Sequence, residues 1–553
     1  MAFDENIYEL RRQKLKQIEA LGQTAYRSKY DVPHTIGYVR DKYEHASAEQ
    51  LDAERPQVQL AGRITAIRLM GKAGFAHLQS TARRDRTGSR KLQIYVKRDA
   101  VGEKGFELYK LLDIGDIVGV RGYLFHTRTG ELTIHVEELT FLAKSFLPLP
   151  EKWHGLTDVE TRYRQRYVDL IMNPQVRGVF IKRSKLIRSI RQFLDEREFV
   201  EVETPMMQPI AGGAVARPFV THHNALDMDL YLRIAPELYL KRLLVGGFDR
   251  VYEINRNFRN EGLSARHNPE FTMLEFYQAY TDCQGVMDLT QDLIVQAVKD
   301  VTKDKNHPDG LAKTTWGDQL IDWTAWTRMS MMGAVIKYWP ASLQPPDRID
   351  FGHWPSLMPK LRRLMDYFNA GNRWPFEWGR QLVALAVEGT LPLDELGIDP
   401  TKAPHGRILA ELFEALVENH LVQPTIIFDF PSDVSPLSKA KSADPFFAER
   451  FEIYAGQMEI SNGFSELNDP VDQRRRFEAQ LKERERGDDE AHQMDEDYIR
   501  ALSYGMPPAG GVGVGVDRLC MLLTDSHTIR DVILFPLLRP EKSPNTEGTE
   551  DKP

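Results

Sequence analysis

Residues 250–280, RVYEINRNFRNEGLSARHNPEFTMLEFYQAY, constrain the fold of this chain more than any other stretch. Two β-type runs, Arg250–Phe258 and Glu270–Ala279, flank a charged loop and predict an antiparallel hairpin. Successive side chains of a strand point to opposite faces, so one face of this hairpin is mostly apolar and the other collects arginines, carboxylates and amides. The hairpin is suited to form the floor of a site for a polar, charged ligand. An ordinary amphipathic hairpin with a solvated face is the alternative.

The glycine-rich run Ala509–Ser526, AGGVGVGVDRLCMLLTDS, is a second constraint. Its glycines alternate with valines, and an apolar helical run begins near Asp517. On a strand, this spacing leaves one face bare, so that a flat ligand or another backbone can approach closely. The spacing differs from that of a dinucleotide-binding turn, in which the glycines lie between a strand and a helix.

Together, the two segments resemble motifs 2 and 3 of the class II aminoacyl-tRNA synthetases, and in particular the lysine branch of that family. The resemblance implies an enzyme that activates L-lysine with ATP to lysyl-adenylate and transfers the lysyl group to the 3′ end of its tRNA. Arg259 matches the arginine that bridges the amino-acid carboxylate and the ATP α-phosphate, a role that suits a planar guanidinium. Phe271 matches the aromatic that stacks on adenine, and Arg518 the arginine that reaches the γ-phosphate. The further positions implied to bind ATP are Glu261, Arg266 and His267.

A third strand-like run, QMEISNGFSEL over 457–467, matches the segment that lines the amino-acid pocket in this family. Glu275 and Glu466, with Tyr277, match the residues that hold the ammonium group of the lysine side chain. A buried ammonium needs carboxylate partners, so two acids suit this role. A surface salt bridge is the usual alternative for a single strand glutamate, but here several pocket positions agree. The other positions implied to bind lysine are Gly213, Glu237, Asn462 and Phe464.

Glu452 and Glu459 match the family's ligands for Mg²⁺ at the ATP phosphates. The resemblance implies more than one Mg²⁺ per active site, with ATP as a substrate. Magnesium commonly binds one or two carboxylates together with phosphate oxygens and water, so a pair of acids suffices. In a regular strand, however, Glu459 is one residue out of phase with Asn462 and Phe464.

The basic charge of the chain is concentrated in residues 57–145, which hold 15 Lys and Arg against 9 Asp and Glu, although the whole chain carries −8. The pattern predicts five strands, with a helix over Glu103–Leu112 between the third and the fourth, which is the order of an OB-fold barrel. The lysine branch has such a domain for binding the tRNA anticodon, and the matching positions are Arg68, Phe75, Gln93 and Glu131. For Phe75, a place in the barrel core is the alternative to base stacking. The predicted strands are Val58–Arg68, Phe75–Gln79, Lys91–Lys97, Asp116–His126 and Leu132–Leu142.

We therefore predict an α+β protein of several domains. An N-terminal helical extension (1–56) precedes the OB-fold domain (57–145), and a proline-rich linker (146–155) leads to a class II catalytic domain (156–540) with an antiparallel sheet flanked by helices. An insertion over about 300–406 holds seven of the eight tryptophans and is expected to be helical, for example over 356–370 and 379–389. It could pack beside the active site or bind a partner. The basic loop 81–91 could touch tRNA or be solvated, and the tail 541–553 is expected to be disordered.

The segment Ser184–Glu196, followed by a short strand over Phe199–Thr204, matches motif 1, which in this family builds a homodimer interface. Composition agrees with a globular protein, since 42% of the 553 residues are hydrophobic and 27% are charged. The sequence contains no run of about 20 apolar residues and no apolar signal core near its start, so we expect no membrane span and a cytoplasmic location. The two cysteines, Cys283 and Cys520, lack metal-ligand spacing, which suits a reducing compartment.

Three alternatives belong to other functions. Aspartate- or asparagine-type ligases share the layout, but they need a cationic or amide-reading pocket, which Glu275 and Glu466 oppose. A lysine-transferring paralogue that modifies elongation factor P usually lacks the OB domain that the sequence predicts over residues 57–145. A non-catalytic RNA-binding or regulatory paralogue would have no need to keep the four chemical residues Arg259, Arg518, Glu452 and Glu459.

Overall fold

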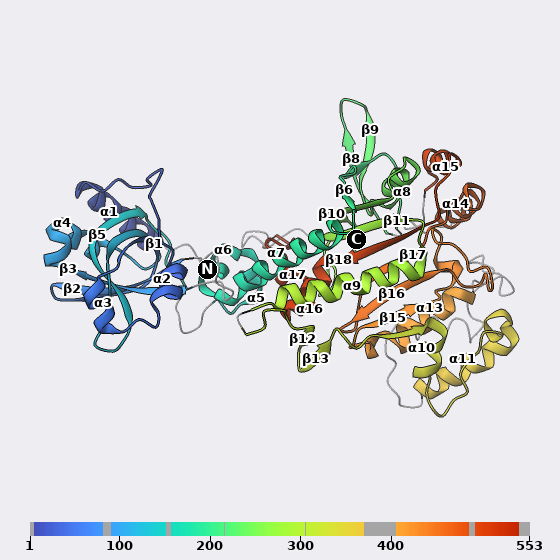
Figure 1. The fold of residues 1–553 in the computed structure, drawn as a ribbon. Coiled ribbons are helices and arrows are strands. Elements are labelled where there is room, and N and C mark those ends of the chain that lie inside the picture. Colours follow the sequence, from blue (N-terminus) through green and yellow to red (C-terminus); the bar gives the residue numbers. More distant parts are fainter. Residues whose placement is uncertain are drawn as a thin grey trace, which may run out of the picture. The chain divides into compact units, whose positions relative to one another are not determined.

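The computed structural model describes residues 5–80, 90–150, 156–214, 216–304, 306–369, 405–485 and 493–540. The chain forms two compact units, Met1–Ile181 and Lys182–Pro553. The first contains a β-barrel and the second a large sheet with helices, which confirms the predicted α+β class (Figure 1). Three predictions fall wholly or mostly outside the described ranges: the basic loop 81–91, the helix over 379–389 and the tail 541–553.

The first unit is built on a closed barrel of five strands in the order β1-β2-β3-β5-β4. Alternate strand residues fill the barrel core, such as Val58 and Leu60 of β1 and Leu92 and Ile94 of β3. A helix lies between β3 and β4 in sequence, so the predicted OB-fold and its five strands are confirmed. The elements are β1 (Gln57–Met70), β2 (Ala73–Ser80), β3 (Arg90–Lys97), α4 (Arg98–Leu111), β4 (Ile117–His126) and β5 (Leu132–Ala143).

Three helices precede the barrel, as the predicted N-terminal extension requires. Ile18, Val39 and Leu51, one from each helix, are fully buried in the same hydrophobic cluster as the barrel core. The second and third helices begin at Thr35 and Ser47, whose side chains accept hydrogen bonds from N–H groups of the first turn. The helices are α1 (Glu5–Ala20), α2 (Ile36–Tyr43) and α3 (Ala48–Glu54).

Two short helices after the barrel, α5 (Val159–Arg164) and α6 (Arg166–Met172), also belong to the first unit. The Gln79 Nε2 of β2 donates to the carbonyl oxygen of Ile171 at 3.0 Å. The boundary between the units lies within α7 (Pro174–Asp195), later than the predicted start of the catalytic domain at residue 156.

The second unit is built on eight strands in the order β14-β15-β16-β17-β18-β11-β10-β6. The six strands from β15 to β10 pair antiparallel, as predicted, whereas β14 and β6 pair parallel at the two edges. The predicted hairpin is β10 (Arg250–Phe258) and β11 (Glu270–Ala279), with the predicted bounds. The other strands are β6 (Val200–Glu201), β14 (Thr327–Ser330), β15 (Thr425–Phe428), β16 (Arg450–Ala455), β17 (Met458–Ser465) and β18 (Ala509–Gly515).

Helices cover this sheet. Figure 1 shows α9 (Cys283–Thr302) and α16 (Val516–Thr524) crossing one face, where both pack on β17 and β18. A further helix, α8 (Glu237–Val245), packs on β10, β11 and α15 (Glu496–Ser503). In α7, which contains the motif 1 segment Ser184–Glu196, Leu186, Ile190 and Leu194 are buried and Ile187 is half-buried. The motif 1 strand is shorter than predicted, because only the two residues of β6 pair with β10. The remaining elements are β7 (Met207–Gln208), β8 (Phe219–His223), β9 (Met228–Leu232), η3 (Ser432–Val434), α14 (Pro470–Glu485) and α17 (Ile529–Val532).

The predicted helical insertion is wrong in its first part. Residues 313–330 form the hairpin β12 (Lys313–Trp316)–β13 (Gln319–Asp322) and the edge strand β14 of the main sheet. The tryptophans there have a structural role in the hairpin, since the buried Trp323 donates from Nε1 to Thr314 Oγ1 at 2.9 Å. The helical part lies between β14 and β15, and its helix α11 confirms the predicted helix 356–370 over 356–369. Residue 370, Trp374 and Trp378 lie outside the described residues. The elements of the helical part are α10 (Met331–Tyr338), η1 (Asp350–Gly352), α11 (Trp354–Asn369), α13 (His405–Leu416) and η2 (Glu418–His420).

Within the described ranges, no helix combines the length and the apolar composition that a membrane span requires.

Candidate active site

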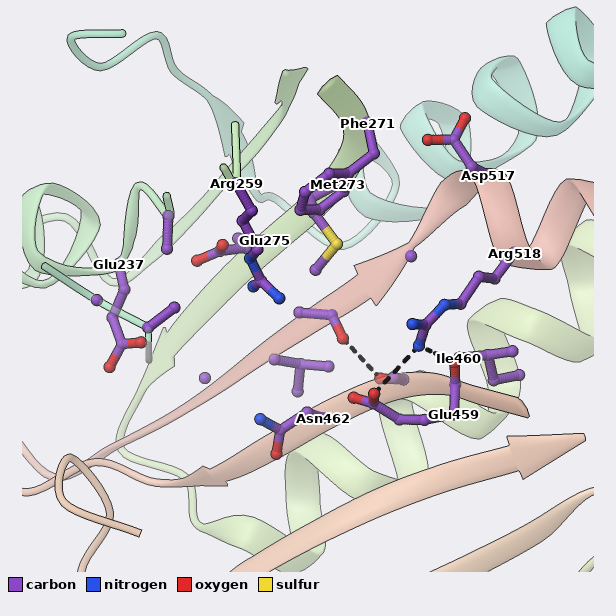
Figure 2. Close-up of a pocket in the computed structure, with 18 of the residues that line it drawn as sticks. Glu237, Arg259, Phe271, Met273, Glu275, Glu459, Ile460, Asn462, Asp517 and Arg518 are labelled. Carbon is purple, nitrogen blue, oxygen red and sulfur yellow. Dashed lines mark hydrogen bonds and ion pairs between the residues drawn. The ribbon is translucent and has the colours of Figure 1, made fainter. Parts of the chain in front are cut away.

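A cavity of about 390 Å³ lies over the centre of the eight-stranded sheet, on β11, β17 and β18 (Figure 2). Its walls are the loop after β10, the start of α8 and residues 434–438. Of the positions predicted to bind lysine, ATP or Mg²⁺, all but Glu452 and Glu466 line this cavity. The lining positions are Gly213, Glu237, Arg259, Glu261, Arg266, His267, Phe271, Glu275, Tyr277, Glu459, Asn462, Phe464 and Arg518.

One end of the cavity is acidic. Glu275 of β11 is buried, and its Oε2 accepts a hydrogen bond from the Tyr277 hydroxyl at 3.2 Å. Burial, together with the nearby carboxylate of Glu237, raises the pKa of Glu275 to about 8. Burial also raises the pKa of Glu237, the first residue of α8. Buried carboxylates with so few donors are stabilised when a cation enters.

Glu466, the residue after β17, lies behind this end and is 1% exposed. Burial raises the pKa of Glu466 to about 8, against the opposing effect of Lys241. Like Oε2, which is in ionic contact with Lys241, its Oε1 has no hydrogen-bond partner among the described residues. A Cβ at position 511 would stand 2.1 Å from this oxygen and 2.4 Å from the Tyr277 ring. Glycine at position 511 therefore leaves room for the side chains of Glu466 and Tyr277 at the end of the cavity. This agrees with the prediction that the glycine-rich strand has a bare face that other groups can approach closely.

Arg259 follows β10 and extends into the cavity (Figure 2). Its backbone N–H donates to the Pro269 carbonyl at 2.9 Å, which holds the two ends of the loop together. The guanidinium carbon lies 5.2 Å from the centre of the Phe271 ring, and Nε has no hydrogen-bond partner among the described residues. A guanidinium with unused donors over an aromatic face is suited to hold anionic groups.

Arg518 of α16 approaches the cavity from another side than Arg259 (Figure 2). Its Nη1 donates to the Glu459 carbonyl at 2.7 Å and to Glu459 Oε2 at 3.1 Å. Its Nη2 is 3.0 Å from Nε2 of His267. Burial and the adjacent Arg518 lower the pKa of His267, so this ring is neutral at pH 7. Arg266 also lines this part of the cavity, which therefore holds two arginines beside the carboxylate of Glu459.

A β-bulge brings Glu459 to the cavity beside Asn462. The register between β16 and β17 shifts at Ile453, so that Ser461 and Glu459 are successive partners and Ile460 is the extra residue. An extra residue inverts the alternation of side chains beyond it. The bulge therefore explains why an out-of-phase glutamate faces the same cavity as Asn462.

Glu452 of β16 lies next to the cavity but does not line it. Its Oε1 accepts from Arg450 Nη2 at 2.6 Å and its Oε2 from the Tyr454 hydroxyl at 2.5 Å. Burial and the neighbouring Glu459 raise the pKa of Glu452 to about 7. Each oxygen keeps a lone pair, and a divalent cation relieves the repulsion between the two acids, so this donor pair fits Mg²⁺. Among the residues with described positions, no three His, Cys, Asp or Glu side chains converge as a complete metal site.

In the first unit, the positions predicted to contact anticodon bases lie on β1, β2 and β3 and just before β5, and Gln93 among them is buried. Glu131 accepts from Gln93 Nε2 at 2.7 Å and is 3.0 Å from His77 Nε2, and Arg68 is exposed. Phe75 is half-buried, with its ring centre 4.8 Å from that of Tyr95, so it does not fill the barrel core. The aromatic surface continues from Tyr95 to Phe125 and His135.

Comparisons with known proteins agree with this geometry. The family described as "tRNA synthetases class II (D, K and N)" matches residues 158–539, and an "OB-fold nucleic acid binding domain" matches residues 58–142. A relative from Moorella thermoacetica named "Lysine--tRNA ligase" is 49% identical over 98% of this chain and 99% of its own length. Relatives of the same name from Pelotomaculum thermopropionicum and Carboxydothermus hydrogenoformans are also 49% identical, over 98% and 97% of this chain and 96% and 98% of their own lengths.

The chain belongs to the lysine–tRNA ligase family of class II synthetases. In this member of the family, sequence reasoning missed charged residues that support the site from beneath. Asp517 forms an ion pair with Arg183 at 2.5 Å and accepts from the Thr272 backbone N–H at 2.6 Å. It thereby links the first turn of α16, which carries Arg518, to β11. The sequence signal that could have indicated this role is a charged residue, Asp517, at the start of an otherwise apolar helix.

Lys241 of α8 is the second missed residue of this lysine–tRNA ligase family member. It is fully buried and pairs with Glu237 and Glu466. In the sequence, it forms an i,i+4 pair with Glu237, which resembles an ordinary surface pair on a helix. The signal against that interpretation is that Leu240 and Leu244, on the same side of the helix, are apolar.

Proposed function

We propose that this chain is a lysine–tRNA ligase, which activates L-lysine with ATP and transfers the lysyl group to the 3′ end of tRNA for lysine. The observation that carries the proposal is the polarity of one cavity, with buried acids at one end and arginines at the other. The two ammonium groups of lysine match the acidic end. The lysine carboxylate and the ATP triphosphate, which meet during activation, match the end with the arginines. An aspartate or asparagine substrate would instead place an anion or an amide against Glu275.

Lysine is assigned by charge. Its side-chain ammonium binds Glu275, Tyr277 and Glu466, and its α-ammonium binds Glu237 beside Gly213, while Asn462 and Phe464 complete the walls. Gly213 has φ +89°, and a Cβ there would stand 3.0 Å from the Glu237 Cβ, so glycine suits this close approach. A cavity of this kind discriminates against an uncharged analogue by on the order of 10⁴-fold, because its own acids would remain unpaired.

Activation joins two anions, and the arginines allow them to meet. Arg259 holds the lysine carboxylate and the α-phosphate together, while Phe271 stacks on adenine. A carboxylate oxygen forms a bond to the α-phosphorus, the bond from that phosphorus to the bridging oxygen breaks, and its electron pair leaves with pyrophosphate. Arg518, Arg266, His267 and Glu261 hold the departing phosphates. Catalysis is placement and stabilisation of charge, so no protein base is needed.

Glu452 and Glu459 are the residues that would hold Mg²⁺ beside the phosphates. Bound there, Mg²⁺ would neutralise phosphate charge. The pairing of Glu459 with Arg518 then links the acid that holds the cation to the arginine that holds the phosphate.

The barrel of the first unit is proposed to bind the anticodon of tRNA through Arg68, Phe75, Gln93 and Glu131. Its aromatic surface offers faces for bases, and its net positive charge favours phosphates. The 3′-terminal ribose hydroxyl then attacks the lysyl carbonyl carbon and forms an ester, AMP leaves with the electron pair of the broken acyl–phosphate anhydride bond, and the hydroxyl proton is released. Through α7 and β6, the chain is proposed to form a homodimer.

The test is ATP–pyrophosphate exchange measured with each of the twenty amino acids. We expect the strongest exchange with lysine, and Mg²⁺ removal by a chelator should abolish it. Strongest exchange with aspartate or asparagine would assign the chain to that type of ligase, and no exchange with any amino acid would favour a non-catalytic protein. An Arg259→Leu preparation, purified in the same way, reports exchange from contaminating host enzyme.

Phe75 provides a second test, directed at tRNA. Phe75→Leu keeps apolar volume but removes the ring face, and stacking contributes about 1–3 kcal/mol per base. We expect the KM for tRNA in lysine charging to rise by roughly 5- to 150-fold, with unchanged ATP–pyrophosphate exchange. Tyr38→Leu, at an exposed aromatic on α2 in the same unit, is the matched control. Equal losses in the two variants would argue against a specific role for Phe75.

A further inference from the structure

A buried lysine, Lys241, lies behind the acidic end of the cavity and contacts two of its carboxylates. The Lys241 side chain is fully buried, with Nζ 2.5 Å from Glu237 Oε1 and in contact with Glu466 Oε2. Its Nζ also lies 5.3 Å from the centre of the Phe464 ring. Burial lowers the pKa of Lys241, but Glu237 and Glu466 more than offset this effect, so the pKa lies above its ordinary value and the ammonium is charged. Lys241 does not line the cavity.

The charges around Lys241 do not balance without a ligand. The groups that face Glu466 are Lys241 and Glu237 on α8, Glu275 and Tyr277 on β11, and Tyr498 on α15. Three of these are carboxylates when Glu466 is included, against one ammonium. Two nearby arginines do not change this count, because Arg450 is paired with Glu452 and Arg233 with Glu253. The ionised acidic end is thus short of two positive charges, and the two ammonium groups of lysine supply that number. The substrate carboxylate lies apart from them, at Arg259.

Lys241 also fixes the direction of Glu466. Its ammonium forms an ion pair with Oε2, whereas Oε1 lies beside Gly511 on the cavity floor. Neither oxygen of Glu466 has a hydrogen-bond partner in the described part of the chain, so the ion pair is what distinguishes the two. One oxygen is therefore held from behind while the other is left for a donor inside the cavity. Lys241 also follows Glu237 by one helical turn, which brings its ammonium to that carboxylate. A single ammonium therefore orients both Glu237 and Glu466.

We propose that Lys241 is a positioning residue for lysine, which acts through Glu237 and Glu466 and leaves the cavity with two uncompensated carboxylates for a diamino acid. The inference rests on the proposed function and assigns the origin of its specificity. Without the Lys241 ammonium, the acids share a dry site with no resident counterion, so they hold protons more tightly. Lysine must then displace those protons before it binds.

The test is Lys241→Met, which keeps the length of the side chain and removes the charge. In ATP–pyrophosphate exchange near pH 7, we expect the KM for lysine to rise at least about tenfold, whereas the KM for ATP changes less than about twofold. The loss should shrink as the pH is raised towards 9, because the acids ionise again and recover their affinity for lysine. A distorted site would not regain activity in this way. Lys241→Gln offers the same comparison if the methionine variant does not fold.

Lys144→Met is the matched control. Lys144 is also fully buried and contacts two carboxylates, Asp113 at 2.5 Å and Asp116 at 2.8 Å, but it lies in the barrel unit. It should leave the KM for lysine and its pH dependence unchanged in pyrophosphate exchange, which needs no tRNA. An equal effect of the two substitutions would show that loss of any buried lysine is sufficient, and would overturn the proposal.

A double-substitution cycle tests the route through Glu466. In a Glu466→Gln background, Lys241→Met should raise the KM for lysine by a smaller factor than in the wild type, because the acid that it orients is already neutral. Equal factors in both backgrounds, or an unchanged KM in Lys241→Met alone, would overturn the inference. Wild-type exchange with lysine is read first: its absence refutes the proposed function, whereas its presence with an unaffected Lys241→Met variant refutes only the role of Lys241.

Discussion

Replacing Arg259 by leucine is expected to lower the kcat of lysine activation by on the order of 10²- to 10⁴-fold. The substitution removes two charge-assisted hydrogen bonds, each of which contributes about 1.5–3 kcal/mol. In the proposed site, one of these bonds goes to the lysine carboxylate and the other to the α-phosphate. They matter most where the two anions meet, so kcat should fall more than the KM of either substrate changes. ATP–pyrophosphate exchange, with lysine and ATP varied in turn, separates these quantities.

Two companion variants make the Arg259 result specific. Arg259→Lys keeps the charge but not the planar fork, so it should recover only part of the activity. Arg250→Leu removes an arginine from the opposite end of the same strand, where Nη1 donates to the Arg197 carbonyl at 2.7 Å outside the cavity. It should change kcat by no more than about twofold. A kcat for Arg259→Leu within about fivefold of the wild type, or roughly 1 kcal/mol, would contradict the bridging role.

Local patterns predicted much of this molecule because they depend on neighbouring residues alone. Alternation over residues 250–258 and 270–279 was sufficient to place both strands of the hairpin. The alternating glycines predicted a strand with a bare face, and Gly511 is the position where this face matters for the site. In the barrel, the order of strands and helix predicted the OB-fold before any pairing was known.

Features that depend on pairing between distant segments could not be predicted in this way. The bulge at Ile460 exists only relative to β16, so the sequence showed Glu459 out of phase and gave no cause. Lys241 pairs with Glu466, which is distant in sequence, so this contact could not be predicted. From the sequence alone, Lys241 resembles the partner of Glu237 in an i,i+4 pair on the helix surface. The strand β14 is defined by its parallel pairing with β15, whereas its tryptophan-rich surroundings favoured a helical insertion. The assigned roles of the site residues stay predictions that the variants described here can test.

Replacing Glu275 by glutamine is expected to lower kcat/KM for lysine by on the order of 10²- to 10⁴-fold, since removal of one partner from a buried ion pair costs about 3–5 kcal/mol. Glutamine has nearly the same shape as glutamate but lacks the charge that the lysine ammonium requires. The KM for ATP should change little, because Phe271 and the arginines, which are proposed to bind ATP, do not pair with Glu275. Steady-state exchange at varied lysine and at varied ATP provides both values.

The stability of the same variant tests the electrostatic reason for this loss. The pKa of Glu275 is raised to about 8 from an ordinary value of 4.5, so between these limits the folded state holds a proton that the unfolded chain has released. The stability of the ligand-free wild type therefore falls as the pH rises through this window, and glutamine removes that loss. At pH 8, without lysine, Glu275→Gln should melt at the same temperature as the wild type or higher, and added lysine should raise its melting temperature less.

The control for Glu275→Gln is Glu270→Gln, an exposed position at the start of the same strand whose Oε1 lies 3.5 Å from Arg256 Nε. It should leave both lysine activation and melting close to wild type. If Glu275→Gln kept near-normal lysine kinetics, this acid would not bind the substrate ammonium, and the polarity of the cavity would need another explanation. If it lost activity and also melted lower at every pH, the loss would reflect packing. Loss of lysine recognition together with undiminished stability is the combination that a substrate-binding carboxylate predicts, because its burial is unfavourable until a cation arrives.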